Sequence, residues 1–187
     1  MIAWINFSVL LVATLLVLSL ELQSAKPAAL EKKIGAIAYN RCTRYRTIAS
    51  LLMGLAGINY IIYFLYPLPI PLARTFSWSW WVSAGIAAAF AIPSACLWLR
   101  EMNAATEKSD WSSNQPYKDV YDLNEHPHLA SELPFWWSIS FLLHSPFLVL
   151  FSLVWAIGLE VVSSVEERDL LLRYRQRRDR KGVLIPN

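Results

Sequence analysis

Apolar residues form four long, nearly uninterrupted blocks along the chain, at 2–20, 48–66, 78–99 and 133–163. They follow neither the alternation of a half-buried strand nor the single stripe of an amphipathic helix in water. A helix needs about 20 apolar residues to cross the roughly 30 Å of bilayer hydrocarbon. The first three blocks therefore each predict one membrane-spanning helix.

The fourth block is too long for one helix at ordinary tilt, and His144-Ser145-Pro146 interrupts it near its middle. Ser145 is a favourable N-cap and Pro146 a favourable first helical residue, so the tripeptide predicts a tight turn between two short helices. We expect these helices at 129–144 and 146–163. The pattern as a whole predicts one all-α integral membrane domain over 1–187, with about five transmembrane helices, the last two forming a hairpin.

Composition agrees with this fold class. The 187 residues are 56% hydrophobic and 17% charged, whereas soluble domains carry roughly 25% charged residues. The net charge is only +3, and the basic residues flank the apolar blocks, so nucleic acid is not an expected partner. Cys42 and Cys96 are far apart in sequence, which predicts neither a disulfide framework nor a metal site.

Basic residues predict the orientation. Residues 21–47 carry six Lys or Arg, whereas 67–77 carry only Arg74, so the first of these segments is expected on the cytoplasmic side. The N-terminus then lies outside, and the loop 100–128 and the tail 164–187 lie inside. No Lys or Arg precedes the first apolar block, which is therefore expected to be a retained helix rather than a signal peptide.

Aromatic residues gather near the ends of the blocks, where Tyr and Trp commonly mark the two membrane interfaces. We expect most of them to act as interfacial anchors, including Trp4, Tyr60, Tyr63, Trp78, Trp80, Trp81, Trp98, Trp136 and Trp137.

An ordered set of polar residues surrounds the predicted hairpin. Tyr121 and His126-Pro127 precede it, Glu166-Glu167 follows it, and Leu184-Ile185-Pro186 stands near the end of the chain. Over roughly 117–187 this order and spacing resembles the C-terminal half of the isoprenylcysteine carboxyl methyltransferase and phospholipid methyltransferase superfamily of integral membrane enzymes. Membrane sterol reductases share a related C-terminal layout.

The resemblance implies a cytoplasm-facing pocket for S-adenosylmethionine, formed by 100–128 and 164–187, and a hydrophobic acceptor that enters from the lipid bilayer. The cofactor-binding residues implied are Tyr121, His126, Pro127, Glu166 and Glu167; no catalytic residue is assigned. Methyl transfer from a sulfonium is an in-line displacement, so the protein mainly positions the reactants. A helix that begins at Pro127 would offer free backbone N–H groups to an anion such as the cofactor carboxylate.

Three departures from the family pattern leave alternatives open. Glu125 stands where the family has Arg, Leu129 stands where it has Tyr, and a Gly-x-x-Tyr element after the acidic pair is missing. A catalytically inactive relative that serves as a membrane scaffold, or that binds another membrane protein, is therefore the alternative. An NADPH-dependent membrane reductase is a further one, although no Gly-rich dinucleotide motif is present. His126 and His128 near acidic residues suggest a metal site only weakly, because a third ligand at convincing spacing is lacking.

Overall fold

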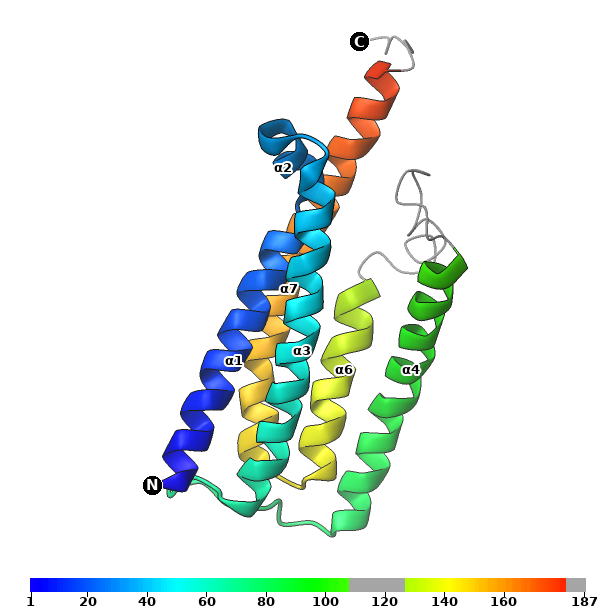
Figure 1. Cartoon of the computed structure of the whole chain (residues 1–187). Coiled ribbons are helices and arrows are strands. Elements are labelled where there is room, and N and C mark those ends of the chain that lie inside the picture. The colour runs from blue at the N-terminus through cyan, green and yellow to red at the C-terminus, as the bar shows by residue number, and fades with distance from the viewer. Residues whose placement is uncertain (108–126, 181–187) are drawn as a thin grey trace. The chain divides into compact units, whose positions relative to one another are not determined.

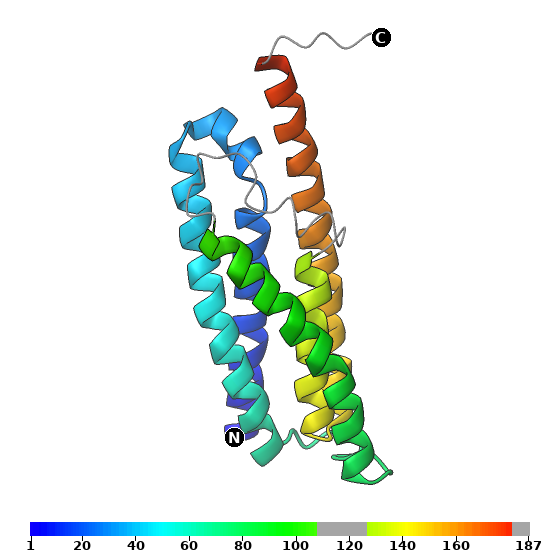
Figure 2. The ribbon, with the colours of Figure 1, turned by 90° about the vertical axis from the view of Figure 1, so that its right-hand side faces the viewer.

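The computed structural model describes residues 1–107 and 127–180, and every regular element in these ranges is a helix (Figures 1 and 2). In chain order the helices are α1 (Ile2–Ser24), α2 (Pro27–Ile34), α3 (Ile37–Leu65), α4 (Trp80–Glu107), α6 (Pro127–Leu142) and α7 (Pro146–Arg180).

Four segments within these helices are long and apolar enough to cross a membrane, namely Ile2–Ser24, Ile37–Leu65, Trp80–Leu99 and Pro146–Leu172. Large apolar side chains on them are exposed, for example Leu51 at 72% and Ile157 at 69%. Soluble proteins rarely expose so much contiguous apolar surface. These features are those of an all-α, multi-pass membrane protein. Helix α6 has 16 residues, which corresponds to about 24 Å, and it is not among the four spans.

Three helices extend well beyond the apolar blocks. Helix α3 begins at Ile37 rather than at 48, α4 continues past 99 to Glu107, and α7 continues past 163 to Arg180. Hydropathy marks only the part of a helix that suits lipid. The backbone hydrogen bonds of a helix need no apolar side chains, so the polar flanks remain helical where the chain leaves the hydrocarbon.

The structure has a turn between two helices where the sequence predicts one, although the first helix spans 127–142 rather than 129–144. Helix α6 ends at Leu142 and α7 begins at Pro146, and the backbone N–H of Leu148 lies 3.4 Å from the Ser145 hydroxyl oxygen that accepts from it. His144 has a positive φ of 54°. Its imidazole Nδ1 lies 2.7 Å from the Ser83 Oγ, and its Nε2 lies 3.1 Å from the carbonyl oxygen of Phe76. His144 therefore ties the turn to the start of α4.

Backbone contacts divide the chain into two compact units. We name Met1–Phe7 with Asn59–Leu159 the hairpin unit, and Ser8–Ile58 with Glu160–Asn187 the tail unit. In the hairpin unit, α4 packs along α6 (Figure 1).

The core of the hairpin unit is aromatic. The rings of Trp136 and Trp155 stack across the hairpin, with centroids 4.1 Å apart, and Tyr60 of α3 lies against Trp136 at 5.0 Å. All three side chains are fully buried. The interfacial role expected for Tyr60 and Trp136 is therefore wrong, because these rings fill the space between helices. Tyr63, expected to act in the same way, is also buried, at 4% exposed. Trp4, Trp80 and Trp98 are exposed, as anchors must be.

Hydroxyl groups beside this core link three helices. The Ser152 Oγ lies 2.9 Å from the Ser140 Oγ and 3.2 Å from the Tyr60 hydroxyl. Lipid tails are as apolar as the helices themselves, so close packing and interhelical hydrogen bonds hold such helices together. Ser140, Ser152 and Tyr60 thus fasten α6, α7 and α3.

Candidate functional site

A buried polar cluster lies in the tail unit and joins three helices. The Arg46 guanidinium of α3 contacts two carboxylates, Glu21 of α1 (Nε to Oε2, 3.8 Å) and Glu166 of α7 (Nη2 to Oε1, 3.5 Å). Each of the two glutamates is only 8% exposed. Buried carboxylates need a cation and hydrogen-bond donors to offset their lost hydration, and Arg46 supplies charge to both.

Asp169, one helical turn after Glu166, caps α2 from another helix. Its Oδ2 accepts a hydrogen bond from the Ala28 N–H at 3.0 Å, and its Oδ1 accepts one from the Ala29 N–H at 2.9 Å. Lys26, at the N-cap position of α2, makes no side-chain capping bond. Asp169 is 2% exposed, so a buried carboxylate meets the positive end of the α2 dipole.

Asp169 therefore stabilises α2, which is too short to be stable as an isolated helix. Isolated helices of eight residues are unstable in water, and α2 lies between the end of α1 and the start of α3 (Figure 1). Replacing Asp169 with alanine is expected to weaken the docking of α2 by about 2 kcal/mol, because two charge-assisted hydrogen bonds are lost. Limited trypsin digestion of the detergent-purified chain measures this as faster cleavage after Lys32 and Lys33.

Arg168→Ala is the matched control, since Arg168 is exposed on the same helix and its loss leaves the cap intact. If Asp169→Ala were cleaved after Lys32 no faster than Arg168→Ala or the unchanged chain, Asp169 would not hold α2 in place.

The residues expected to bind the cofactor have different surroundings. Glu166 is buried beside Arg46, whereas Glu167 is exposed on α7. Both belong to the tail unit. Pro127 is the first residue of α6 in the hairpin unit. Tyr121 and His126 lie outside the described residues.

Sequence reasoning missed the partners of Glu166. Arg46 entered only as one of six basic residues that set orientation, and Glu21 was assigned no role. One signal was present in the sequence: Glu166 and Asp169 are three residues apart, which places both carboxylates on one face of a helix. Which cation and which helix end they meet depends on tertiary packing.

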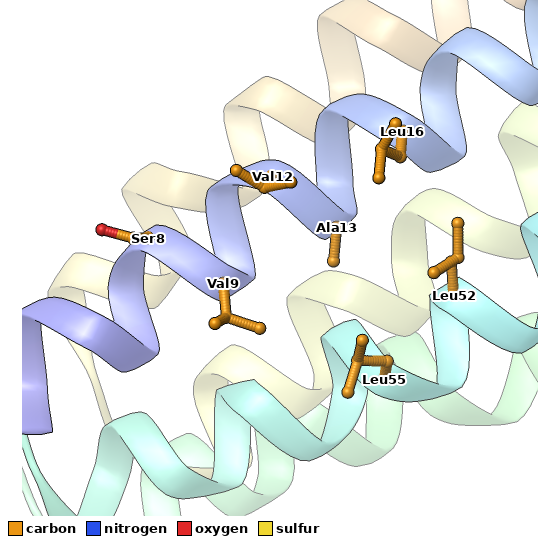
Figure 3. Close-up of a pocket in the computed structure, with 7 residues that line it drawn as sticks. All are labelled: Ser8, Val9, Val12, Ala13, Leu16, Leu52 and Leu55. Carbon is orange, nitrogen blue, oxygen red and sulfur yellow. The ribbon is translucent and has the colours of Figure 1, made fainter.

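The tail unit also has an apolar groove between α1 and α3, with a volume of about 280 Å³. Figure 3 shows Val9 and Ala13 of α1 pointing towards Leu52 and Leu55 of α3. Ser8, Val12 and Leu16 complete the lining. The surface offered to a ligand is apolar, so the groove suits a hydrocarbon chain and not a polar headgroup.

Among residues 1–107 and 127–180, no group of three or more His, Cys, Asp or Glu side chains is arranged to hold a metal ion. Comparisons of the chain with family models, with curated proteins and with solved structures give no match.

Proposed function

We propose that the chain is a membrane-embedded, S-adenosylmethionine-dependent methyltransferase that acts on a lipophilic acceptor of the isoprenylcysteine or phospholipid kind. The observation that carries the proposal is the order of Tyr121, His126-Pro127, a helical hairpin and Glu166-Glu167. The positions of the helices support the proposal, because α6 begins at Pro127 and α7 carries both glutamates.

The described residues include a group that suits the cofactor. Glu167 presents an exposed carboxylate, which could accept hydrogen bonds from ribose hydroxyls or from an ammonium group. Bound there, the sulfonium of the cofactor would supply an electrophilic methyl group. Tyr121 and His126 are assigned to the same task by the resemblance.

Glu166 takes a different role in this proposal. Its side chain is buried beside Arg46, so we assign it to positioning: the ion pair holds α7 against α3 and thereby fixes the direction in which Glu167 points. Helices α1 and α3 form the groove shown in Figure 3. The hydrocarbon tail of the methyl acceptor would contact only apolar side chains and Ser8 there.

Binding of S-adenosylhomocysteine, the product form of the cofactor, tests the proposal. Calorimetry of the full chain in detergent should give saturable binding, and Glu167→Gln should weaken it about tenfold, as expected when a charged acceptor is replaced by a neutral one. Glu160→Gln is the matched control: Glu160 is exposed on the same helix, two turns earlier, and its loss should leave the affinity unchanged.

The absence of saturable binding would overturn the methyltransferase proposal. The alternative, an inactive relative that serves as a scaffold or binds another membrane protein, is favoured by Glu125 and Leu129 at the motif. It predicts no affinity for the cofactor in the unchanged chain, and Glu125→Arg would then be the variant to restore binding. Saturable binding of NADPH in the same assay would instead support a reductase.

We further infer the orientation and the number of spans. The six basic residues of 21–47 and the basic end of α7 favour the cytoplasmic side for these segments and the outside for the N-terminus. Helix α6 would be the fifth span. Its 16 residues fall short of the hydrocarbon thickness, so the bilayer would thin locally around it.

A further inference from the structure

We infer that the segment from Lys26 to Arg44 is a docking surface for anionic phospholipid headgroups. The segment carries five basic side chains, all exposed, which we call the basic surface: Lys26, Lys32, Lys33, Arg41 and Arg44. It has a single acidic residue, Glu31, whose carboxylate accepts a hydrogen bond from the Tyr39 hydroxyl at 3.1 Å. Five basic residues against one acidic residue give this segment a net charge of +4.

Exposed apolar residues stand within the basic surface. Ile34 is 36% exposed and Ile37 is 69% exposed, on either side of the turn at Gly35, which has a φ of +69°. Lys32 and Lys33 directly precede this apolar turn. Apolar side chains that insert at the acyl boundary, next to lysines at the headgroup level, are the pattern of an interfacial membrane contact. Nucleic acid and free phosphate would explain the lysines but not the isoleucines.

The position of the basic surface supplies a second argument. Helix α2 lies between two candidate membrane-spanning helices, Ile2–Ser24 and Ile37–Leu65. The apolar parts of these helices end at Leu20 and begin at Ile48, so Lys26, Arg41 and Arg44 lie within about 11 Å of the hydrocarbon, near the level of the headgroups. Lipid headgroups are therefore the anions that the basic surface meets at the highest local concentration.

The basic surface is also held in place. Pro27 and Ala28 are buried, and Asp169 accepts hydrogen bonds from Ala28 and Ala29. Arg46, the remaining basic residue of the first loop, is turned inward to Glu21 and Glu166. Arg46 thus serves the fold, whereas the five cations of the basic surface are exposed. Arg41 among them also donates a hydrogen bond to the Tyr45 hydroxyl at 2.7 Å.

Native mass spectrometry of the full chain in uncharged detergent tests the inference. The chain is titrated with phosphatidylglycerol and, separately, with phosphatidylcholine of identical acyl chains. We expect preferential retention of phosphatidylglycerol, and we expect Lys33→Gln to reduce that preference about fivefold, the effect of one basic residue near an anionic membrane surface. Lys32→Gln/Lys33→Gln should reduce it further.

Arg74→Gln is the matched control, because Arg74 is an exposed cation in the loop between α3 and α4 and its loss changes the net charge equally. Equal retention of the two lipids by the unchanged chain would overturn the inference, as would equal losses for Lys33→Gln and Arg74→Gln. Displacement of phosphatidylglycerol by excess inorganic phosphate, or tighter binding of an RNA oligonucleotide, would identify a different anion as the partner and would also overturn it.

Discussion

Trp155→Ala is expected to lower the free energy of unfolding by about 3 kcal/mol, the lower end of the range for a buried tryptophan. Trp155 is fully buried, and its ring stacks on Trp136 with centroids 4.1 Å apart. In water, most of such a loss comes from returning apolar surface to solvent. In a bilayer that part is small, because lipid tails are as apolar as the removed ring. The expected loss in a bilayer therefore comes from the missing ring stacking and from the cavity left between α6 and α7.

Steric trapping of the full chain in bicelles measures this free energy without dependence on tryptophan fluorescence. Trp81→Ala is the matched control: Trp81 is 78% exposed on α4, so its removal leaves no cavity and should change stability by less than about 0.5 kcal/mol. Equal destabilisation by the two variants would show that the Trp136–Trp155 stack does not hold the hairpin.

The hairpin was predictable because its signal is local. Ser145 accepts a hydrogen bond from the N–H of Leu148 three residues later, and Pro146 stands where a helix needs no donor. Helix caps of this kind depend only on neighbouring residues, so they can be recognised from a sequence. The membrane class was predictable for a similar reason, since apolar length alone sets whether a helix suits the bilayer.

The role of each aromatic residue was less predictable. Tyr60 and Trp136 sit at block ends like Trp80 and Trp98, yet the first two are fully buried and the last two are exposed. Position along the chain gives the depth of a residue in the membrane, but it does not give the direction of its side chain. In lipid, apolar character cannot separate the two directions, because the core and the surroundings are equally apolar.

The polar cluster could not be predicted for a different reason. Its members stand at 21, 46 and 166, so their meeting depends on how α1, α3 and α7 pack in the tail unit. The sequence resemblance marked Glu166 as a cofactor ligand. The structure places that carboxylate beside Arg46, which leaves the exposed Glu167 as the better candidate for contact with a ligand.

Arg46→Met should cost about 3 kcal/mol of unfolding free energy, since it removes a cation from two buried carboxylates and leaves an apolar chain of similar length. The figure lies at the low end of the range for buried pairs, because the Arg46 side chain is 28% exposed and its contacts are 3.5 Å and 3.8 Å long. Arg44→Met, an exposed position on the same helix, is the control and should be nearly neutral.

A double variant separates lost charge pairing from lost packing. If the cost of Arg46→Met arises from the carboxylates left without this cation, then Glu166→Gln in the same chain should recover part of it, and the two effects should be non-additive by about 1 kcal/mol or more. Steric trapping of the four proteins of the cycle measures the coupling. Strict additivity would mean that Arg46 stabilises α3 through Glu21 or through the packing of its stem and not through Glu166, and the role of Glu166 as a positioning residue would then fail.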